Sequence, residues 1–94
     1  MPEARLEIIW TDYLKYRAGL RGFDLTEIEQ VVRHSSERYF DTETRRLVVV
    51  GRVGEALAVI PCDRSQDTIT PVTIHMITRQ QVNFRLKTGR FANE

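Results

Sequence analysis

The hydrophobic pattern of this 94-residue chain changes its period once, directly after Ser35 and Ser36. Before that point apolar residues recur at helical spacing, and beyond it they follow the pattern of strands. The predicted strands are joined by short loops. Because parallel neighbours need crossovers of about a dozen residues or more, short loops favour an antiparallel meander. The sequence therefore predicts a small α+β domain.

The first predicted helix covers residues 12–21, DYLKYRAGLR. Thr11 can cap its start, and Gly22 can end it in the left-handed conformation that glycine adopts readily. Its apolar residues at helical spacing are Tyr13, Tyr16 and Leu20. We expect the two tyrosines to lie in the core or at its rim, and Trp10 to anchor the helix to the core.

Two further helices begin with the pattern of a capping box, in which side chains satisfy free backbone N–H groups of the first turn. Asp24 and Glu27 form the first pattern, and Thr78 and Gln81 form the second. The apolar stripes of these helices are Leu25, Ile28, Val31 and Val32 in one and Val82 and Leu86 in the other. Gly89 ends the last helix.

Four strands are predicted between the second and third helices, at residues 38–41, 47–52, 57–62 and 72–77. Gly51 and Gly54 suit the bend between the second and third strands, since glycine has no side chain to obstruct it. Residues 63–70 form a predicted polar loop, and Pro71 opens the fourth strand. The predicted order is α-α-β-β-β-β-α, with an antiparallel sheet that the helices cover on one face.

Composition excludes several classes of protein. The longest apolar run, residues 47–50, is far shorter than the roughly 20 residues that a membrane helix needs. The N-terminal segment MPEARLEIIW is acidic and lacks an apolar core, so we expect no secretory signal and a cytoplasmic protein. Cys62 is the only cysteine, which excludes an intrachain disulfide, and no Cys and His cluster has zinc-site spacing. We expect Cys62 to be a small buried hydrophobic residue.

The charge balance gives little sign of a nucleic-acid partner, because such domains are usually strongly basic. Fourteen Lys and Arg face thirteen Asp and Glu, for a net charge of +1. The charges are unevenly distributed, however. Residues 1–30 contain four basic and six acidic side chains, whereas residues 61–94 contain five and three. An acidic front and a basic end are compatible with RNA contact over a small area.

Strand alternation places two sets of side chains on faces of the predicted sheet. The sets are Arg46, Val48, Val50 and Arg52 in one strand and Thr73, His75, Ile77 and Arg79 in another. If they share a face, three arginines and a histidine converge on a partly apolar concavity. Arginine matches phosphate oxygens, and histidine exchanges protons near neutral pH. Such a group can support attack of an RNA 2′-hydroxyl on the adjacent phosphorus, without metal or other cofactor. The alternative is that these arginines only keep an exposed face soluble.

Four segments carry a family resemblance, at residues 10–24, 46–52, 57–64 and 73–79. Trp10 precedes the first helix, RGFD enters the second, Arg46 stands five residues before Gly51, and Arg79 ends the last strand. On these pieces the chain resembles the BrnT toxins and a neighbouring family of small domains, both associated with the RelE-like fold of bacterial type II toxin–antitoxin systems. The resemblance implies a single RelE-like domain over residues 1–94. It also implies a metal-independent endoribonuclease that cuts mRNA, with Arg46 and Arg79 matching recurrent arginines of the family.

The remaining candidate site residues come from departures from the BrnT pattern. The lysine or histidine of the family's first helix falls on Tyr13, with Lys15 and Arg17 nearby. Arg85 stands where BrnT sequences tend to carry a glutamate. These residues add to those that strand alternation places on one face. We expect the catalytic residues to be Arg46, Arg79, His75 and Tyr13, and the substrate-binding residues to be Arg52, Arg17, Lys15 and Arg85.

The expected partners are an RNA substrate and a cognate antitoxin protein, for which a ribbon-helix-helix protein is one candidate. Homodimerisation through strand edges is left open. Two other functions stay open as well. The chain can be a noncatalytic interaction module of the same fold that holds a protein partner, or a nucleic-acid binder that does not cleave and whose affinity falls with salt.

Overall fold

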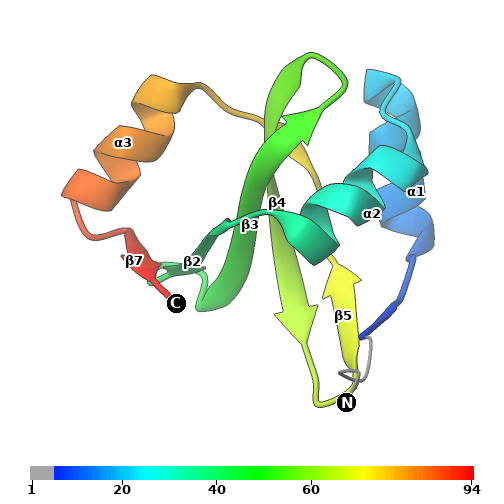
Figure 1. The fold of residues 1–94 in the computed structure, drawn as a ribbon, viewed down its shortest axis with the longest axis horizontal. Helices are drawn as coiled ribbons and strands as arrows, with labels where there is room; N and C mark the ends of the chain where they lie inside the picture. Colours follow the sequence, from blue (N-terminus) through cyan, green and yellow to red (C-terminus); the bar gives the residue numbers. More distant parts are fainter. Residues whose placement is uncertain (1–5) are drawn as a thin grey trace.

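A computed structural model describes residues 6–94 of the chain. Residues 1–5, which contribute to the expectation about a secretory signal, lie outside the described part. Within it, three helices and a seven-stranded mixed sheet form one α+β domain, as the sequence predicts (Figure 1). The elements are β1 (Glu7–Ile8), α1 (Asp12–Arg21), α2 (Leu25–His34), β2 (Glu37–Asp41), β3 (Arg46–Val53), β4 (Ala56–Arg64), β5 (Thr68–Pro71), β6 (His75–Met76), α3 (Arg79–Lys87) and β7 (Phe91–Asn93).

The three helices lie where the sequence predicts them, because their signals are local. The Thr11 hydroxyl accepts a hydrogen bond from a backbone N–H of the first turn at 3.0 Å. Thr78 and Gln81 form the predicted capping box, with reciprocal bonds of 3.0 and 2.9 Å. Asp24 caps α2 by accepting from the N–H of Thr26 at 2.7 Å. These side chains satisfy backbone donors that the helices cannot satisfy themselves.

The sheet is mixed, so the prediction of a wholly antiparallel sheet is wrong. The strand order is β1-β5-β4-β3-β2-β7, and β6 pairs with β4. β1 and β5 are parallel, with Glu7 opposite Thr68 and Ile8 opposite Ile69, and all other pairs are antiparallel. Two helices and three strands separate β1 from β5, which leaves ample chain for the crossover that a parallel pair requires.

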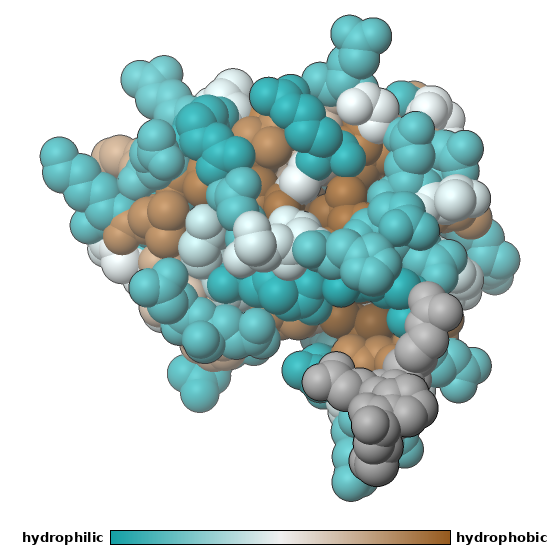
Figure 2. Space-filling model, viewed as in Figure 1, coloured by the Kyte–Doolittle hydropathy of each residue, from teal (hydrophilic) through white to brown (hydrophobic). Residues whose placement is uncertain are grey.

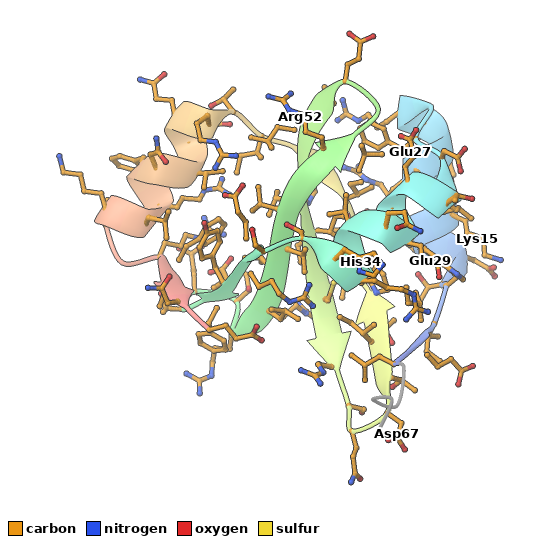
Figure 3. All side chains as sticks on the ribbon, in the orientation of Figure 1. Lys15, Glu27, Glu29, His34, Arg52 and Asp67 are labelled. Atoms are coloured by element: carbon orange, nitrogen blue, oxygen red, sulfur yellow. The ribbon has the colours of Figure 1, made fainter. Side chains whose placement is uncertain are left out.

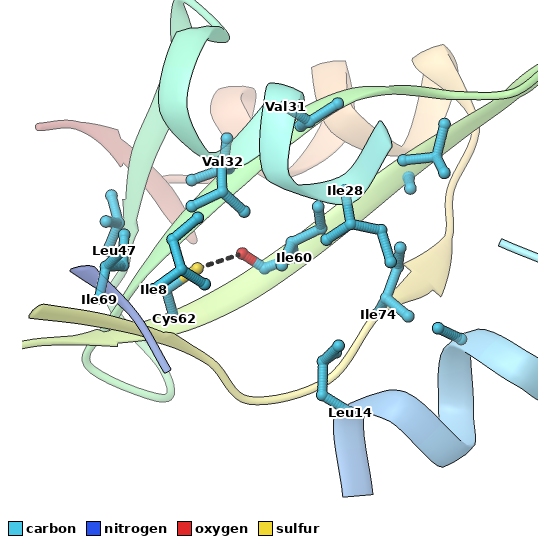
Figure 4. Close-up of a cluster of buried hydrophobic side chains, with 14 residues drawn as sticks. Ile8, Leu14, Ile28, Val31, Val32, Leu47, Ile60, Cys62, Ile69 and Ile74 are labelled. Carbon is cyan, nitrogen blue, oxygen red and sulfur yellow. Dashed lines mark hydrogen bonds between the residues drawn. The ribbon is translucent and has the colours of Figure 1, made fainter. Parts of the chain in front are cut away.

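Helices cover both faces of the sheet, which corrects the expectation that they cover one (Figure 1). Leu47 and Val49 of β3 pack in a core with α1 and α2, which Figure 4 shows in close-up. Val48 and Val50 pack in a second core with Val82 of α3. Because alternate residues of a strand point to opposite faces, a strand that is apolar at every position needs cover on both sides.

The strands after β4 differ most from the prediction. The predicted polar loop at residues 63–70 contains the end of β4 and most of β5, which Pro71 ends rather than opens. The predicted strand at residues 72–77 is reduced to β6, because Ile74 turns into the core beside α1 and α2. β1 and β7 are additional short edge strands that the hydrophobic pattern does not indicate.

The face that α1 buries is not the predicted one. Leu14 and Ala18 are the buried residues of this helix, whereas Tyr13, Tyr16 and Leu20 are 56%, 62% and 61% exposed. Because Leu14 and Ala18, four residues apart, form the inward face of the helix, Tyr13, Tyr16 and Leu20 lie on its other sides. Trp10 packs against the core as expected.

Cys62 is a buried small residue, as predicted, with 1% of its surface exposed. Its Sγ lies 3.4 Å from the carbonyl oxygen of Ile60, the contact drawn as a dashed line in Figure 4. Burial raises the pKa of the Cys62 thiol to about 12, so the thiol is protonated at neutral pH and unsuited to act as a nucleophile.

Gly51 lies inside β3 rather than in the bend, where Gly54 adopts a positive φ of 62°. A Cβ at position 51 would lie 2.7 Å from Cγ1 of Val31, so α2 packs directly on the bare backbone. We expect Gly51→Ala to lower the free energy of unfolding by about 1–3 kcal/mol through overpacking, measured by urea denaturation. The double variant with Val31→Ala should recover part of this loss, and a purely additive pair would contradict the close-packing explanation.

Among residues 6–94, no helix is both long enough and apolar enough to cross a membrane.

Candidate functional site: the His75 pocket

One pocket lies on the α3 side of the sheet, where Arg85 of α3 forms part of its wall. It has a volume of about 320 Å³. Val48, Val59 and Phe91 supply its apolar surface, and its polar lining includes Arg46, Thr73, His75, Arg85, Arg90 and Asp41. We call this site the His75 pocket. Its mixture of an apolar floor and converging polar groups is typical of ligand sites.

Strand register brings His75 and Arg46 to the same pocket. His75 of β6 lies opposite Val59 of β4, and Val59 belongs to the core beneath α3. Arg46 precedes Val48 by two residues in β3, so the two side chains share a face. The shared face expected from alternation therefore holds for these two residues and for Thr73, which also lines the pocket.

The side chain of Arg17, on α1, reaches His75 around the edge of the sheet. Arg17 Nη2 lies 3.1 Å from Nδ1 of His75. Because a guanidinium group can only donate, Nδ1 must accept, and the proton of the neutral ring is assigned to Nε2. The hydrogen bond thus selects a neutral tautomer of His75 and leaves its Nε2–H free to donate to an anion.

The surroundings of His75 oppose its protonation. Desolvation, together with the positive charges of Arg17, Arg21 and Arg85, lowers the pKa of His75 below its usual 6.5. At pH 7 the imidazole is therefore neutral. A neutral imidazole is the form that can accept a proton as a general base.

An NMR titration of the histidine ring signals checks this assignment. We expect the pKa of His75 to lie below 6.5, and to rise in Arg17→Gln because that change removes the nearest positive charge. The chain has two histidines, so a His34→Gln variant identifies the His75 signal. A pKa at or above 6.5 in the unmodified protein would show that the arginines do not control this ring.

The cations near the pocket differ in how they are neutralised. Arg46 Nε donates to Asp63 at 2.8 Å, and Arg90 donates to both oxygens of Asp41 at 3.2 Å each. Within the described part of the chain, Arg17 and Arg85 form no salt bridge with a carboxylate. These two guanidinium groups give the pocket an excess of positive charge that suits an anionic ligand.

Two contacts hold the pocket wall in place. The Arg85 guanidinium carbon lies 5.5 Å from the ring centroid of Phe91, which in turn stacks on Tyr39 at 5.7 Å. Burial acts to raise the pKa of Asp41, but hydrogen bonds from Arg90 and from two backbone N–H groups outweigh it and hold that pKa below its usual value. Asp41 therefore remains a carboxylate and keeps Arg90 fixed.

Five of the eight residues expected in the site lie outside the pocket lining, although one of them, Arg17, contacts His75 from α1. Arg79 begins α3 instead of ending a strand, and its two Nη atoms donate to Glu37 at 2.6 and 2.9 Å. This pairing lowers the pKa of Glu37. Arg52 donates to the carbonyl oxygen of Glu55 at 3.0 Å, at the β3–β4 turn seen at the top of Figure 3. The structure does not bring these two arginines together with His75.

The α1 candidates are divided between the two sides of the helix. Figure 3 shows Lys15 on the outer side of α1, away from the sheet. Tyr13 is exposed and precedes Arg17 by four residues, so the two side chains share a face of the helix. Among the described residues, Arg17 is the α1 candidate that forms a hydrogen bond with His75.

Asp41 and Arg90, which lie on β2 and next to β7, also belong to the site, although no pattern in the sequence indicates them. The site also retains unused hydrogen-bonding capacity, which the sequence does not reveal. Within residues 6–94, the Thr73 hydroxyl and Arg17 Nε are shielded from solvent and have no hydrogen-bond partner. Buried polar groups are usually paired, and because Thr73 lines the pocket, its hydroxyl can serve a ligand there.

No group of three or more potential metal ligands occurs in the part of the chain that the structure describes. Comparisons with models of known families, with curated proteins and with solved structures find no match to this chain.

Proposed function

We propose that this protein is a metal-independent endoribonuclease that cleaves single-stranded RNA in the His75 pocket, and that it acts in the cytoplasm as the toxin of a toxin–antitoxin system. One observation carries the proposal: a neutral histidine, hydrogen-bonded to Arg17, stands in a pocket lined by further arginines. The resemblance to BrnT toxins and their RelE-like fold points to the same activity.

The arginines would bind the scissile phosphate. Arg85 has its planar donor group at the pocket, and Arg46 lines the same wall. The attacked phosphorus gains negative charge in the transition state, and guanidinium groups already in position stabilise that charge. Nε2–H of His75 can add a hydrogen bond to a phosphate oxygen as the substrate enters.

Proton transfer would require Arg17 to change its partner. When a phosphate enters, Arg17 can donate to a phosphate oxygen, which frees Nδ1 of His75. That nitrogen then accepts the proton of the 2′-hydroxyl, and the 2′-oxygen bonds to phosphorus as the bond to the 5′-oxygen breaks. The leaving 5′-oxygen takes up a proton, with Tyr13 as the candidate donor beside Arg17. The products are a 2′,3′-cyclic phosphate and a 5′-hydroxyl.

An antitoxin would keep the enzyme inactive by covering the mouth of the pocket. A ribbon-helix-helix protein is the candidate antitoxin, and the short edge strands β1 and β7 are the candidate surfaces for a homodimer. An antitoxin or a second copy of the chain would block the pocket only while it is bound. Its dissociation would make the arginines accessible to RNA.

Controlled expression in bacteria tests the toxin role. We expect the wild-type protein to arrest growth and the His75→Ala protein, accumulated to the same level, to leave growth unchanged. Normal growth with abundant folded wild-type protein would contradict the proposal and favour a noncatalytic interaction module. Arrest by both proteins would show that the toxicity does not depend on the pocket.

A further inference from the structure

We infer that the hollow beside α3 is a nucleobase subsite in which Phe84 stacks on a base of single-stranded RNA, next to the phosphate held in the His75 pocket. The inference rests on the proposed function and specifies how the same site holds its substrate.

Phe84 is the most exposed large hydrophobic residue among the described residues, with 65% of its surface accessible. It projects from α3 into a hollow of about 630 Å³. Figure 2 shows apolar surface gathered over α3, at the left of the view. Val82, two residues earlier, is fully buried, so the exposure of Phe84 belongs to the outer side of the helix. A ring exposed to this extent adds little to the packing of the domain.

The hollow adjoins the His75 pocket, and two arginines stand between them. Arg85 and Arg90 line both spaces. A phosphate bound by Arg85 in one space therefore leaves an adjoining nucleotide next to the ring of Phe84 in the other. Arginines that follow the backbone and aromatic side chains that stack on bases are the usual components of single-strand binding sites.

Polar groups around Phe84 suit the edges of a base. Gln80 and Thr88 line the hollow with donor and acceptor groups, and Glu43 adds a carboxylate whose nearest oxygen is 3.7 Å from Nη1 of Arg90. The two arginines match the phosphate oxygens of a nucleotide, and the exposed ring matches the face of its base, so the lining as a whole suits a nucleotide.

The test measures binding without cleavage. The probe is a fluorescein-labelled heptamer of 2′-O-methyl RNA, which lacks the attacking hydroxyl, and a second heptamer of the same length carries abasic positions. Fluorescence anisotropy gives the affinity of each. We expect Phe84→Ala to weaken binding of the base-containing heptamer roughly 5- to 100-fold and to leave the abasic heptamer unaffected.

Two variants serve as controls. Phe84→Trp should retain the affinity, because a tryptophan ring also stacks on bases. Tyr16→Ala should bind as the wild type does, since Tyr16 is a similarly exposed aromatic residue on α1, at 62%. Thermal melts verify that each variant is folded.

Unchanged affinity in Phe84→Ala, or an equal loss for both heptamers, would overturn the inference. So would a wild-type protein that does not distinguish the two heptamers. Base-dependent binding without any cleavage of ordinary RNA would instead support the subsite and contradict the nuclease, so the two proposals fail separately.

Discussion

His75→Ala is expected to slow RNA cleavage by at least about 100-fold, because it removes the group proposed to accept the 2′-hydroxyl proton. His75 is exposed on a two-residue strand, and its replacement should leave the free energy of unfolding nearly unchanged. Single-turnover cleavage of a labelled RNA, with folding checked by circular dichroism, measures the effect.

His34→Ala is the matched control. This second histidine is also exposed, but it lies on α2, on the opposite side of the sheet from the pocket. We expect the His34 variant to cleave at the wild-type rate. Equal rates in both variants and the wild type would contradict the assignment of His75.

Phe91→Ala is expected to lower the free energy of unfolding by about 3–5 kcal/mol, which is a large share of the stability of a domain of this size. Phe91 is 2% exposed and belongs to the core beneath α3, where it stacks on Tyr39 and lies under Arg85. Chemical denaturation followed by circular dichroism measures the change.

Phe84→Ala provides a control with the same chemical change at an exposed position of α3. We expect a change within about 0.5 kcal/mol for this variant. If Phe91→Ala prevents folding altogether, Phe91→Leu keeps most of the apolar volume and should fold with a smaller loss. Similar effects for Phe84→Ala and Phe91→Ala would show that β7 does not complete the core.

The helices and the central strands could be predicted because their signals are local. A cap such as Thr11 or the pair Thr78 and Gln81 fixes a helix start within four residues, and β3 and β4 are long apolar runs. β5 could not be predicted in the same way. It has four residues in a polar stretch, and one of its partners, β1, lies some sixty residues earlier.

Two errors had a signal in the sequence. The uninterrupted apolar run at residues 47–50 already indicates a strand buried on both faces, which is incompatible with helices on one side only. Gly51 follows that run directly, where a glycine can mark the close approach of another element rather than a bend. Its contact with Val31 shows that this is its role.

Only part of the site could be predicted. The alternation of side chains correctly places Arg46 and His75 on one face, because the face that a residue occupies depends on its position along its own strand. It does not reveal that Glu37 pairs with Arg79, nor that Arg17 reaches His75 around the edge of the sheet. Such contacts depend on how distant elements pack and carry no local sequence pattern.

We propose that the His75 pocket cleaves RNA without metal. To test this, the purified protein is incubated with end-labelled single-stranded RNA in EDTA, and the ends of the products are analysed. We predict fragments that carry 2′,3′-cyclic phosphate and 5′-hydroxyl ends, and none with the His75→Ala protein. Intact RNA with the folded wild-type protein, or fragments with 3′-hydroxyl ends, would contradict the claim.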